Sequence, residues 1–291
     1  GFRVNSGEYK VMGLAPYGEA KYKDLIYDYL IDVKEDGSFN MDMSYFDYNV
    51  GLTMTNKKFN DLFGGPPREP ESELTQKEMD LARSVQDVTE EIVLKMAKHV
   101  KQVTNQKYLC LAGGVALNCV ANGKLLRSGI FDDIFIQPAA GDAGGALGCA
   151  YIAWYQHLEN ERIADGKNDF MNGAYLGPEF SNNEIKRYLD KKNYKYKKLT
   201  DDELPEKIAD LINQQNVIGW FQGRMEFGPR ALGGRTIIGD SRSSETQKTI
   251  NLKIKYRESF RPFAPSIREE NISEYFDIDS CLLYTSPSPR D

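Results

Sequence analysis

The chain has 291 residues and a formal net charge of −6, with 41% apolar and 27% charged residues, which is ordinary for a globular protein long enough for two domains. The acidic balance argues against a general nucleic-acid-binding protein, which carries a basic excess. The sequence also holds no apolar run of membrane-spanning length, so we expect neither a nucleic-acid nor a membrane partner.

Cysteine is sparse, with Cys110, Cys119, Cys149 and Cys281 and no CxxC pair. The first three lie in apolar segments, where we expect buried free thiols. Sparse cysteine and the lack of a signal peptide predict a reducing, cytoplasmic setting.

Both ends of the sequence are unusual. The chain begins at Gly1 rather than Met, and residues 281–291 have no periodicity and resemble a translated sequencing adapter. We therefore expect a piece of a longer protein, cut at both ends and inactive by itself, and we exclude residues 281–291 from the fold.

The first motif is GEYKVMGLAPYG, Gly7–Gly18, which ends as a turn at Pro16 and Gly18. Its Lys10 is either a phosphate contact or a solvated lysine. A short helix is predicted over 21–30. Residues 31–70 hold a turn at Asp36-Gly37, possible hairpin strands and a break at 64–67, and we assign no chemistry to them.

A long helix is predicted over 74–103. Its apolar residues recur at three- and four-residue steps, which predicts one apolar face packed in the core. The members of this stripe are Leu81, Val85, Val88, Ile92, Met96 and Val103.

Two units of strand, glycine loop and helix follow. Strands over 108–112 and 133–137 lead into loops over 113–118 and 138–148, and helices run to about Leu126 and Leu158. A helix N-terminus after such a loop binds phosphate through unpaired N–H groups and the helix dipole, so we expect two sides of one nucleotide cleft. Alternatively, the glycines serve tight packing. The candidate nucleotide-binding residues are Lys10, Gly113, Gly114, Val115, Asn118, Gly141, Gly144 and Gly145.

Asp142 is a carboxylate among glycines at the end of a strand. It is placed to ligate a cation or accept from a ribose, or simply to cap the following helix, and the pattern does not decide between these roles.

The second half begins with a polar linker over 161–172. Ser181 and Glu184 predict a capping box for a helix over 183–191, and a further helix is predicted over 204–214. A buried strand is expected over 217–221, a short strand over 236–239, and a helix over 244–255.

Between those strands lies GRMEFGPRALGGR, with Arg224, Arg230 and Arg235 set among glycines. Guanidinium groups recognise phosphate in a planar, bidentate manner, and glycines allow a ligand to approach the backbone. Glu226 is expected to fix one of the arginines in a defined rotamer. The loop thus predicts a site for a multiply charged anion, and the alternative is a solvated turn.

This loop and the following KYRESFRPFAPS, residues 255–266, closely resemble the O-carbamoyltransferases, which include nodulation and antibiotic carbamoyltransferases. Two upstream blocks, at 7–18 and 138–148, match the same family in the same order, and the resemblance extends to about Phe276. It implies two α/β domains. Residues 1–160 would be the C-terminal lobe of an actin-like ATPase domain like that of the threonylcarbamoyl transferases, and 173–280 a partial domain like the threonylcarbamoyl-AMP synthases.

The resemblance also implies site roles. Arg230, Lys255 and Arg261 match positions that hold carbamoyl phosphate and the nucleotide phosphates, and Arg224, Arg235 and Arg257 fit the same basic wall, with Glu226 as an orienting residue. Asp142 matches a ligand of a divalent metal, expected to be iron, whose other ligands come from an HxxxH-type motif that this sequence does not contain.

The implied function is a two-step O-carbamoyl transfer. Carbamoyl phosphate and ATP give carbamoyl adenylate, and a hydroxyl of a small-molecule or glycan acceptor then takes the carbamoyl group. The alternatives are a tRNA threonylcarbamoyl-adenosine transferase, which the net acidity disfavours, and a non-catalytic nucleotide-binding module. Neither the acceptor nor the oligomeric state can be inferred from the sequence.

Overall fold

A computed structural model describes residues 1–2, 7–70, 72–166 and 169–276 and has a mixed α/β fold. The predicted adapter segment 281–291, with Cys281, lies outside these residues. The α-helices are α1 (Glu8–Leu14), α2 (Lys23–Leu25), α3 (Lys57–Leu62), α4 (Gln76–Thr104), α5 (Cys119–Arg127), α6 (Asp142–Tyr151), α7 (Asn182–Lys191), α8 (Glu203–Asn213), α9 (Ser244–Thr249) and α10 (Ile272–Tyr275). The strands are β1 (Ile31–Val33), β2 (Phe39–Met41), β3 (Tyr108–Leu111), β4 (Asp133–Ile136), β5 (Ile218–Phe221) and β6 (Arg235–Ile238).

Short turns of 3-10 or π-helix extend several of these elements. They are η1 (Ala15–Tyr17), η2 (Ile26–Leu30), η3 (Met43–Tyr45), η4 (Gly114–Leu117), η5 (Ile152–His157), η6 (Asn172–Ala174), η7 (Ile250–Ile254) and η8 (Glu269–Asn271). The chain forms two compact units, one comprising Gly1–Ile136 and the segment that begins at Phe260, the other comprising Gln137–Ser259.

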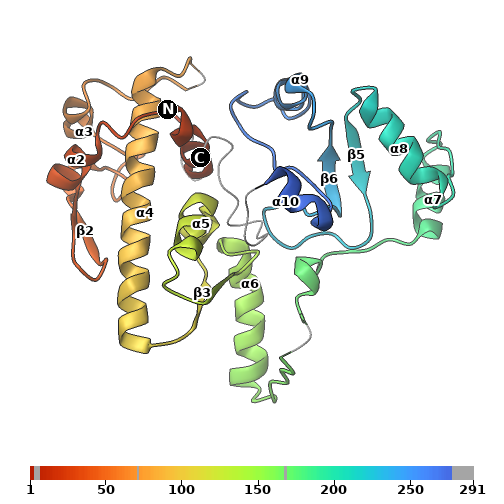
Figure 1. The fold of residues 1–291 in the computed structure, drawn as a ribbon, viewed down its shortest axis with the longest axis horizontal. Helices are drawn as coiled ribbons and strands as arrows, with labels where there is room; N and C mark the ends of the chain where they lie inside the picture. Colours follow the sequence, from red (N-terminus) through yellow and green to blue (C-terminus); the bar gives the residue numbers. More distant parts are fainter. Residues whose placement is uncertain (3–6, 71, 167–168, 277–291) are drawn as a thin grey trace. The chain divides into compact units, whose positions relative to one another are not determined.

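The first unit is built on α4, which contacts α1, η1, α2 and α5 (Figure 1). A capping box fixes its start, with Thr75 and Glu78 satisfying each other's backbone N–H groups. One apolar cluster joins Val88 and Ile92 of α4 to η2, η3 and Phe63, and a smaller one joins Ala82 to Leu14 and Ala15. The expected hairpin is present as the antiparallel pair β1–β2.

The predicted apolar stripe of α4 is only partly buried. Val85, Met96 and Val103 are exposed, so the prediction of a wholly apolar core face was wrong. The buried face instead alternates small or apolar residues with polar ones. Its members are Asp80, Ala82, Ser84, Gln86, Val88, Glu90, Ile92 and Ala97. The polar members Asp80, Ser84, Gln86 and Glu90 are buried because they hydrogen-bond to segments that pack on the helix.

Strands β3 and β4 form a parallel pair in which Leu111 lies opposite Ile136, so both strands end at the same edge. Ile134 and Ile136 are buried, whereas Tyr108 and Phe135 on the alternate positions are exposed. Cys110 shares the exposed face, and Cys149 on α6 is exposed as well. The expectation of buried thiols was therefore wrong at these two positions. Cys110 is exposed because only one face of the strand pair is covered, and α6, which carries Cys149, has no buried residues.

In the second unit, β5 and β6 pair antiparallel and α8 contacts β5 (Figure 1). The predicted capping box of α7 is present, with Ser181 and Glu184 bonded reciprocally. Strand β5 was expected to be buried, but half-buried and exposed residues alternate along it, and Phe221 is exposed. Among the described helices of both units, none combines the length and apolarity needed to span a bilayer.

Candidate functional site

The arginine loop is the connection of a β-hairpin. It runs from Gln222 to Gly234, between β5 and β6, and the N–H of Gln222 donates to the Gly234 carbonyl at 2.9 Å. The segment after the predicted linker holds the loop in place. The N–H of Met225 donates to Pro178 at 3.1 Å, and that of Phe227 donates to Ala174 at 2.7 Å.

Glu226 organises the backbone of this loop. Its carboxylate is buried and accepts N–H groups from Leu232 and Gly234, both at 2.7 Å, and from Arg235. Burial alone raises the pKa of Glu226, but these backbone donors outweigh burial and leave its pKa below the ordinary value. The expectation that Glu226 orients an arginine side chain was wrong, because its oxygens are bonded to main-chain N–H groups.

Two of the arginines, Arg224 and Arg235, are hydrogen-bonded to carbonyl groups in and beside the loop. The Arg235 guanidinium donates to the carbonyls of Gln222 and Gly223 and lies 3.4 Å from the centroid of the Phe221 ring. Arg224 donates to the Gly177 carbonyl at 3.0 Å and lies 3.6 Å from a carboxylate oxygen of Glu179. Both side chains thus contribute to the shape of the loop.

Arg230 is the loop arginine left available. Its half-buried side chain forms no hydrogen bond or ion pair with any residue that the structure describes. The preceding Gly228 has φ +138°, and a Cβ there would stand 2.8 Å from the Pro138 carbonyl oxygen. Only glycine allows this approach, so the turn carrying Arg230 is fixed against the start of the second glycine loop.

The remaining basic residues divide between the units. Lys255 ends η7 and is exposed, while the Arg257 side chain donates to the buried Asn251 at 2.7 Å. Arg261 belongs to the first unit, where its guanidinium carbon lies 4.7 Å from the ring centroid of Tyr9. Of the predicted phosphate-binding set, the second unit therefore holds Arg224, Arg230, Arg235, Lys255 and Arg257.

The first glycine loop follows β3. Gly113 has φ +104°, η4 comes next, and Asn118 caps α5 by accepting the Ala121 N–H at 3.1 Å. Positions 113 and 114 have open space beside the backbone, as a ligand would need. The side-chain amide of Asn118, a residue predicted to bind nucleotide, pairs with Gln86 of α4. No motif pointed to Gln86, because a glutamine within a long helix has no distinctive sequence context.

The second glycine loop leads into α6, whose N-cap is Gly141. Asp142 occupies the first helical position, so the interpretation of Asp142 as the N-cap was wrong. Gly144 serves packing, since a Cβ there would stand 2.1 Å from the Ala139 carbonyl oxygen, whereas Gly141 and Gly145 have open space. An acidic residue in the first turn complements the positive end of the helix dipole.

Among the described residues, the donor set for a metal is incomplete. The part of the chain that the structure describes contains no group of three or more His, Cys, Asp or Glu side chains that could hold a metal ion. A single exposed carboxylate, Asp142, does not fit an iron site, which takes several protein ligands. Metal ligation by Asp142 therefore stays a prediction, and no chemical step below depends on it.

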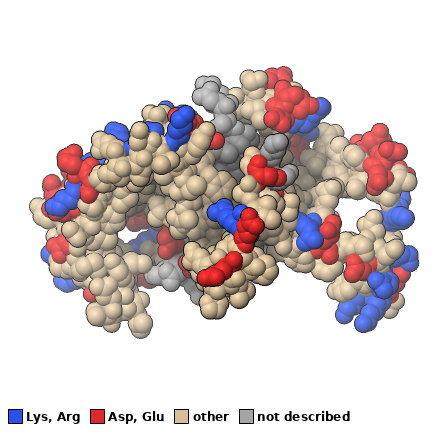
Figure 2. Space-filling view, turned by 90° about the horizontal axis from the view of Figure 1, so that it is seen from below, with Lys and Arg blue, Asp and Glu red and all other residues tan. Residues whose placement is uncertain are grey.

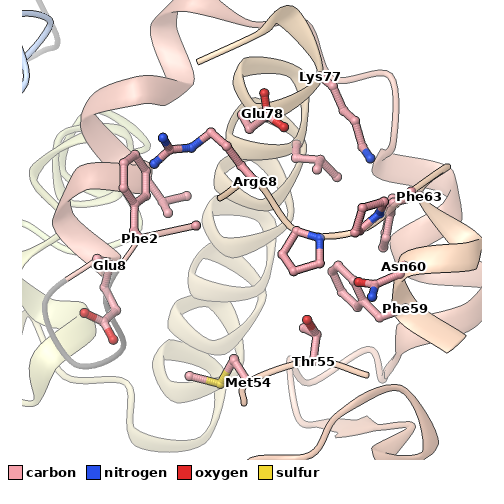
Figure 3. Close-up of a pocket in the computed structure, with 17 residues that line it drawn as sticks. Phe2, Glu8, Met54, Thr55, Phe59, Asn60, Phe63, Arg68, Lys77 and Glu78 are labelled. Carbon is pink, nitrogen blue, oxygen red and sulfur yellow. The ribbon is translucent and has the colours of Figure 1, made fainter. Parts of the chain in front are cut away.

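Lys10 of the first motif lies on α1, with its ammonium nitrogen 5.4 Å from the ring centroid of Phe2. A cavity of about 390 Å³ opens beside this region, between α1, α3 and the start of α4 (Figure 3). Its walls include Phe59, Phe63 and Leu81. Its polar groups come from residues that include Thr55, Asn60 and Lys77.

Charge is mixed over the surface. On the face that Figure 2 draws, the Lys and Arg side chains of the described residues form small separate groups interspersed with Asp and Glu. The features of this α/β protein that a phosphorylated ligand would need are the hairpin loop with its available arginine and the helix N-termini after glycine loops.

Comparison with known proteins places the chain in a family. Residues 1–151 match the family model described as Carbamoyltransferase N-terminus, and residues 209–287 match Carbamoyltransferase C-terminus. The chain belongs to the carbamoyltransferase family, as its motifs had predicted.

Three relatives illustrate the match. An uncharacterized protein of Synechocystis, sll1178, is 60% identical over 99% of this chain and 46% of its own length. The nodulation protein NolNO of Sinorhizobium fredii is 40% identical over 93% of the chain and 38% of its own length. A 3'-hydroxymethylcephem-O-carbamoyltransferase of Streptomyces clavuligerus is 32% identical over 59% of the chain and 30% of its own length. The chain thus spans less than half the length of each of these three relatives.

Proposed function

We propose that the full-length protein containing this chain is an ATP-dependent O-carbamoyltransferase that works in two steps. In the first, the carbamoyl group of carbamoyl phosphate becomes attached to the α-phosphate of ATP. One water is consumed, and pyrophosphate and inorganic phosphate leave. In the second, the oxygen of an acceptor hydroxyl attacks the carbamoyl carbon, AMP departs and the hydroxyl proton is released. The family match supports carbamoyl transfer, and the ATP-dependent route rests on the resemblance of the motifs.

The position of Arg230 is the main support for the first step of this proposal. Its turn is fixed by Gly228 and by the Glu226 network, yet its guanidinium is not bonded to any described residue. A guanidinium that stands on a fixed turn and is left unbonded by the described residues is suited to binding a phosphate and to stabilising the charge that develops on departing pyrophosphate. Lys255 and Arg257 of the same unit supply further positive charge for two polyanionic substrates.

The second step belongs to the first unit in this proposal. The loop over 113–118 follows β3, one strand of the parallel pair β3–β4, and precedes α5, which is the setting in which helix N-termini hold nucleotide phosphates. Gly113 and Gly114 leave room for the phosphate of carbamoyl adenylate. We also propose that this unit is the actin-like lobe that the motifs resemble.

Pyrophosphate release tests the first step. In the full-length protein, Arg230→Ala should lower the rate of carbamoyl-phosphate-dependent pyrophosphate release from ATP by roughly 10²–10³-fold, as expected for loss of a charge-stabilising group. Arg187→Ala on the exposed surface of α7 is the matched control and should leave the rate unchanged. An unchanged rate in Arg230→Ala would exclude the loop as the site. ATP binding without any pyrophosphate release would instead favour a non-catalytic nucleotide-binding module.

The cavity beside α4 is our candidate for the acceptor site. Its volume falls in the range of small-molecule pockets, and an apolar wall with a few polar groups suits a hydroxyl-bearing molecule with one apolar face. Figure 3 places Phe59, Asn60 and Phe63 together on one side and Phe2 on the other.

Lys77 allows a direct test of this cavity. Lys77→Met keeps the length of the side chain but removes its charge, so it should raise KM for the acceptor several-fold while leaving pyrophosphate release unaffected. Lys98→Met, at an exposed position of the same helix, is the control. Equal acceptor KM values in the two variants would contradict the assignment.

A further inference from the structure

The buried face of α4 is rich in polar side chains. Asp80, Ser84, Gln86 and Glu90 are between 0% and 5% exposed, on a helix whose exposed side carries apolar residues such as Val85. Burying polar groups costs free energy unless each one is hydrogen-bonded. Such a row is therefore expected to have specific partners, and its partners lie in two separate segments of the chain.

The first two members hold the segment that follows the Gly7–Gly18 motif. Asp80 accepts the Glu19 N–H at 2.9 Å, and Ser84 accepts the Tyr22 N–H at 3.0 Å. The chain at Gly18 passes so close to α4 that a Cβ there would stand 2.0 Å from the Met79 carbonyl oxygen. The end of the motif is thus fixed to the N-terminal half of α4.

The next two members hold the first glycine loop. Gln86 and Asn118 form a reciprocal amide pair, in which Asn118 Nδ2 donates to Gln86 Oε1 at 2.9 Å and Gln86 Nε2 donates to Asn118 Oδ1 at 3.1 Å. Gln86 Nε2 also donates to Glu90 at 2.7 Å, and Glu90 pairs with Lys124 of α5. All four groups are joined in one network between α4 and α5.

We propose that Gln86 is a positioning residue that, through Asn118 and Glu90, holds the Gly113–Asn118 loop in the geometry that receives the phosphate of the carbamoyl nucleotide. This inference rests on the proposed function of the loop. In this proposal Gln86 and Glu90 act through Asn118 and α5, to which they are bonded, and not by binding the phosphate themselves.

The hydrogen bonds of the Gln86 and Asn118 side chains suit a pair of amides, because each amide both donates and accepts. Asn118 Oδ1 also accepts the Ala121 N–H, so its side chain joins the start of α5 to α4 in a single contact. With its amide bonded in this way, Asn118 contributes to phosphate binding by placing backbone N–H groups rather than by its side chain. A loop that shifts by a fraction of an ångström presents these donors poorly, because catalytic positioning is sensitive to displacements of about 1 Å.

The test compares Gln86→Leu with Gln102→Leu in the full-length protein. Gln102 is an exposed glutamine on the same helix, so the chemical change is identical. For Gln86→Leu we expect KM for carbamoyl adenylate in the transfer step to rise about fivefold to tenfold, the factor carried by one or two ordinary hydrogen bonds. Pyrophosphate release, which belongs to the other unit, should stay at the wild-type rate, as should both steps in Gln102→Leu.

Amide hydrogen exchange gives a readout independent of activity. The N–H groups of Ala116 and Asn118, both hydrogen-bonded within the loop, should exchange faster in Gln86→Leu, while the N–H of Tyr22 should not. If Gln86→Leu does not fold, Asn118→Asp is the milder variant. It keeps the cap of α5 and an acceptor for Gln86 Nε2 but loses one donor, and a roughly threefold rise in KM is expected.

The outcomes separate the two proposals. Unchanged KM and unchanged exchange at Ala116 and Asn118 would overturn the role of Gln86. A lower kcat with unaltered KM would mean a general structural role and would overturn it as well. If the wild-type protein performs neither step, the proposed function fails, and unchanged exchange in Gln86→Leu would then reject the positioning role separately.

Discussion

At the scale of single residues, Glu226 holds the arginine loop through the main chain. Arginines flank it along the chain, but its carboxylate accepts main-chain N–H groups of Leu232, Gly234 and Arg235. A buried carboxylate in a glycine-rich loop finds several N–H donors at once, and these bonds to an ionised acceptor are strong. Whether the Glu226 carboxylate bonds to arginine side chains or to main-chain N–H groups depends on how the loop folds. The spacing of residues along the sequence does not give that information.

Glu226→Gln should reveal this role. The amide oxygen can still accept, but the charge is lost and the NH₂ group faces other donors, so we expect a destabilisation of about 1–3 kcal/mol. Denaturant unfolding measures it, with Glu161→Gln in the exposed linker as the control. An unfolding free energy equal to that of the wild type would show that the carboxylate does not hold the loop.

The same variant predicts a pH dependence. The pKa of Glu226 is lower in the folded protein than its ordinary value of 4.5, so its ionised form stabilises the fold. This contribution is fully present above pH 4.5 and is lost as the pH falls through the folded-state pKa. The difference in unfolding free energy between wild type and Glu226→Gln should therefore shrink as the solution is acidified, and a constant difference would contradict this account.

At the scale of elements, periodicity and caps predicted most helices and strands within a few residues. The helix predicted over 183–191 appears as α7, with the Ser181–Glu184 capping box in place. The burial pattern was harder to predict. Which side of α4 is buried depends on segments that are distant in sequence. Gln86, for example, hydrogen-bonds to Asn118, which lies 32 residues further along the chain. The predicted apolar stripe gave a good helical period, and its members Val88 and Ile92 are buried. Val85 and Met96 are exposed, because α4 also buries polar residues that hydrogen-bond to neighbouring segments.

Two of the short sheets, β3–β4 and β5–β6, illustrate the same limit. Apolar runs predicted β3, β4 and β5, but a run of four apolar residues does not tell how many faces will be covered. Phe135 and Phe221 lie on faces that neighbouring elements leave open. The sequence therefore predicted where strands begin and end better than it predicted which side chains they bury.

At the scale of the whole molecule, family motifs occur in both compact units, and the predicted phosphate-binding residues divide between them. Arg230 and Lys255 lie in the unit Gln137–Ser259, and Arg261 lies in the other unit. Motif matching compares positions along the chain, so it does not tell to which unit each residue belongs. The predicted boundary at residues 161–172 and the role of Asp142 as a metal ligand stay predictions.

A division of labour between the units can be tested by supplying the intermediate. If Arg230 serves only the adenylate-forming step, then the full-length Arg230→Ala variant given carbamoyl adenylate directly should transfer the carbamoyl group at the wild-type rate. Gln86→Leu under the same conditions should keep its raised KM, because its defect lies in receiving that nucleotide. The measurement is acceptor carbamoylation against carbamoyl adenylate concentration, with Arg187→Ala as the control. Transfer by Arg230→Ala that stays slow with the intermediate supplied would place Arg230 in the second step, and the two units could then not be assigned separate reactions.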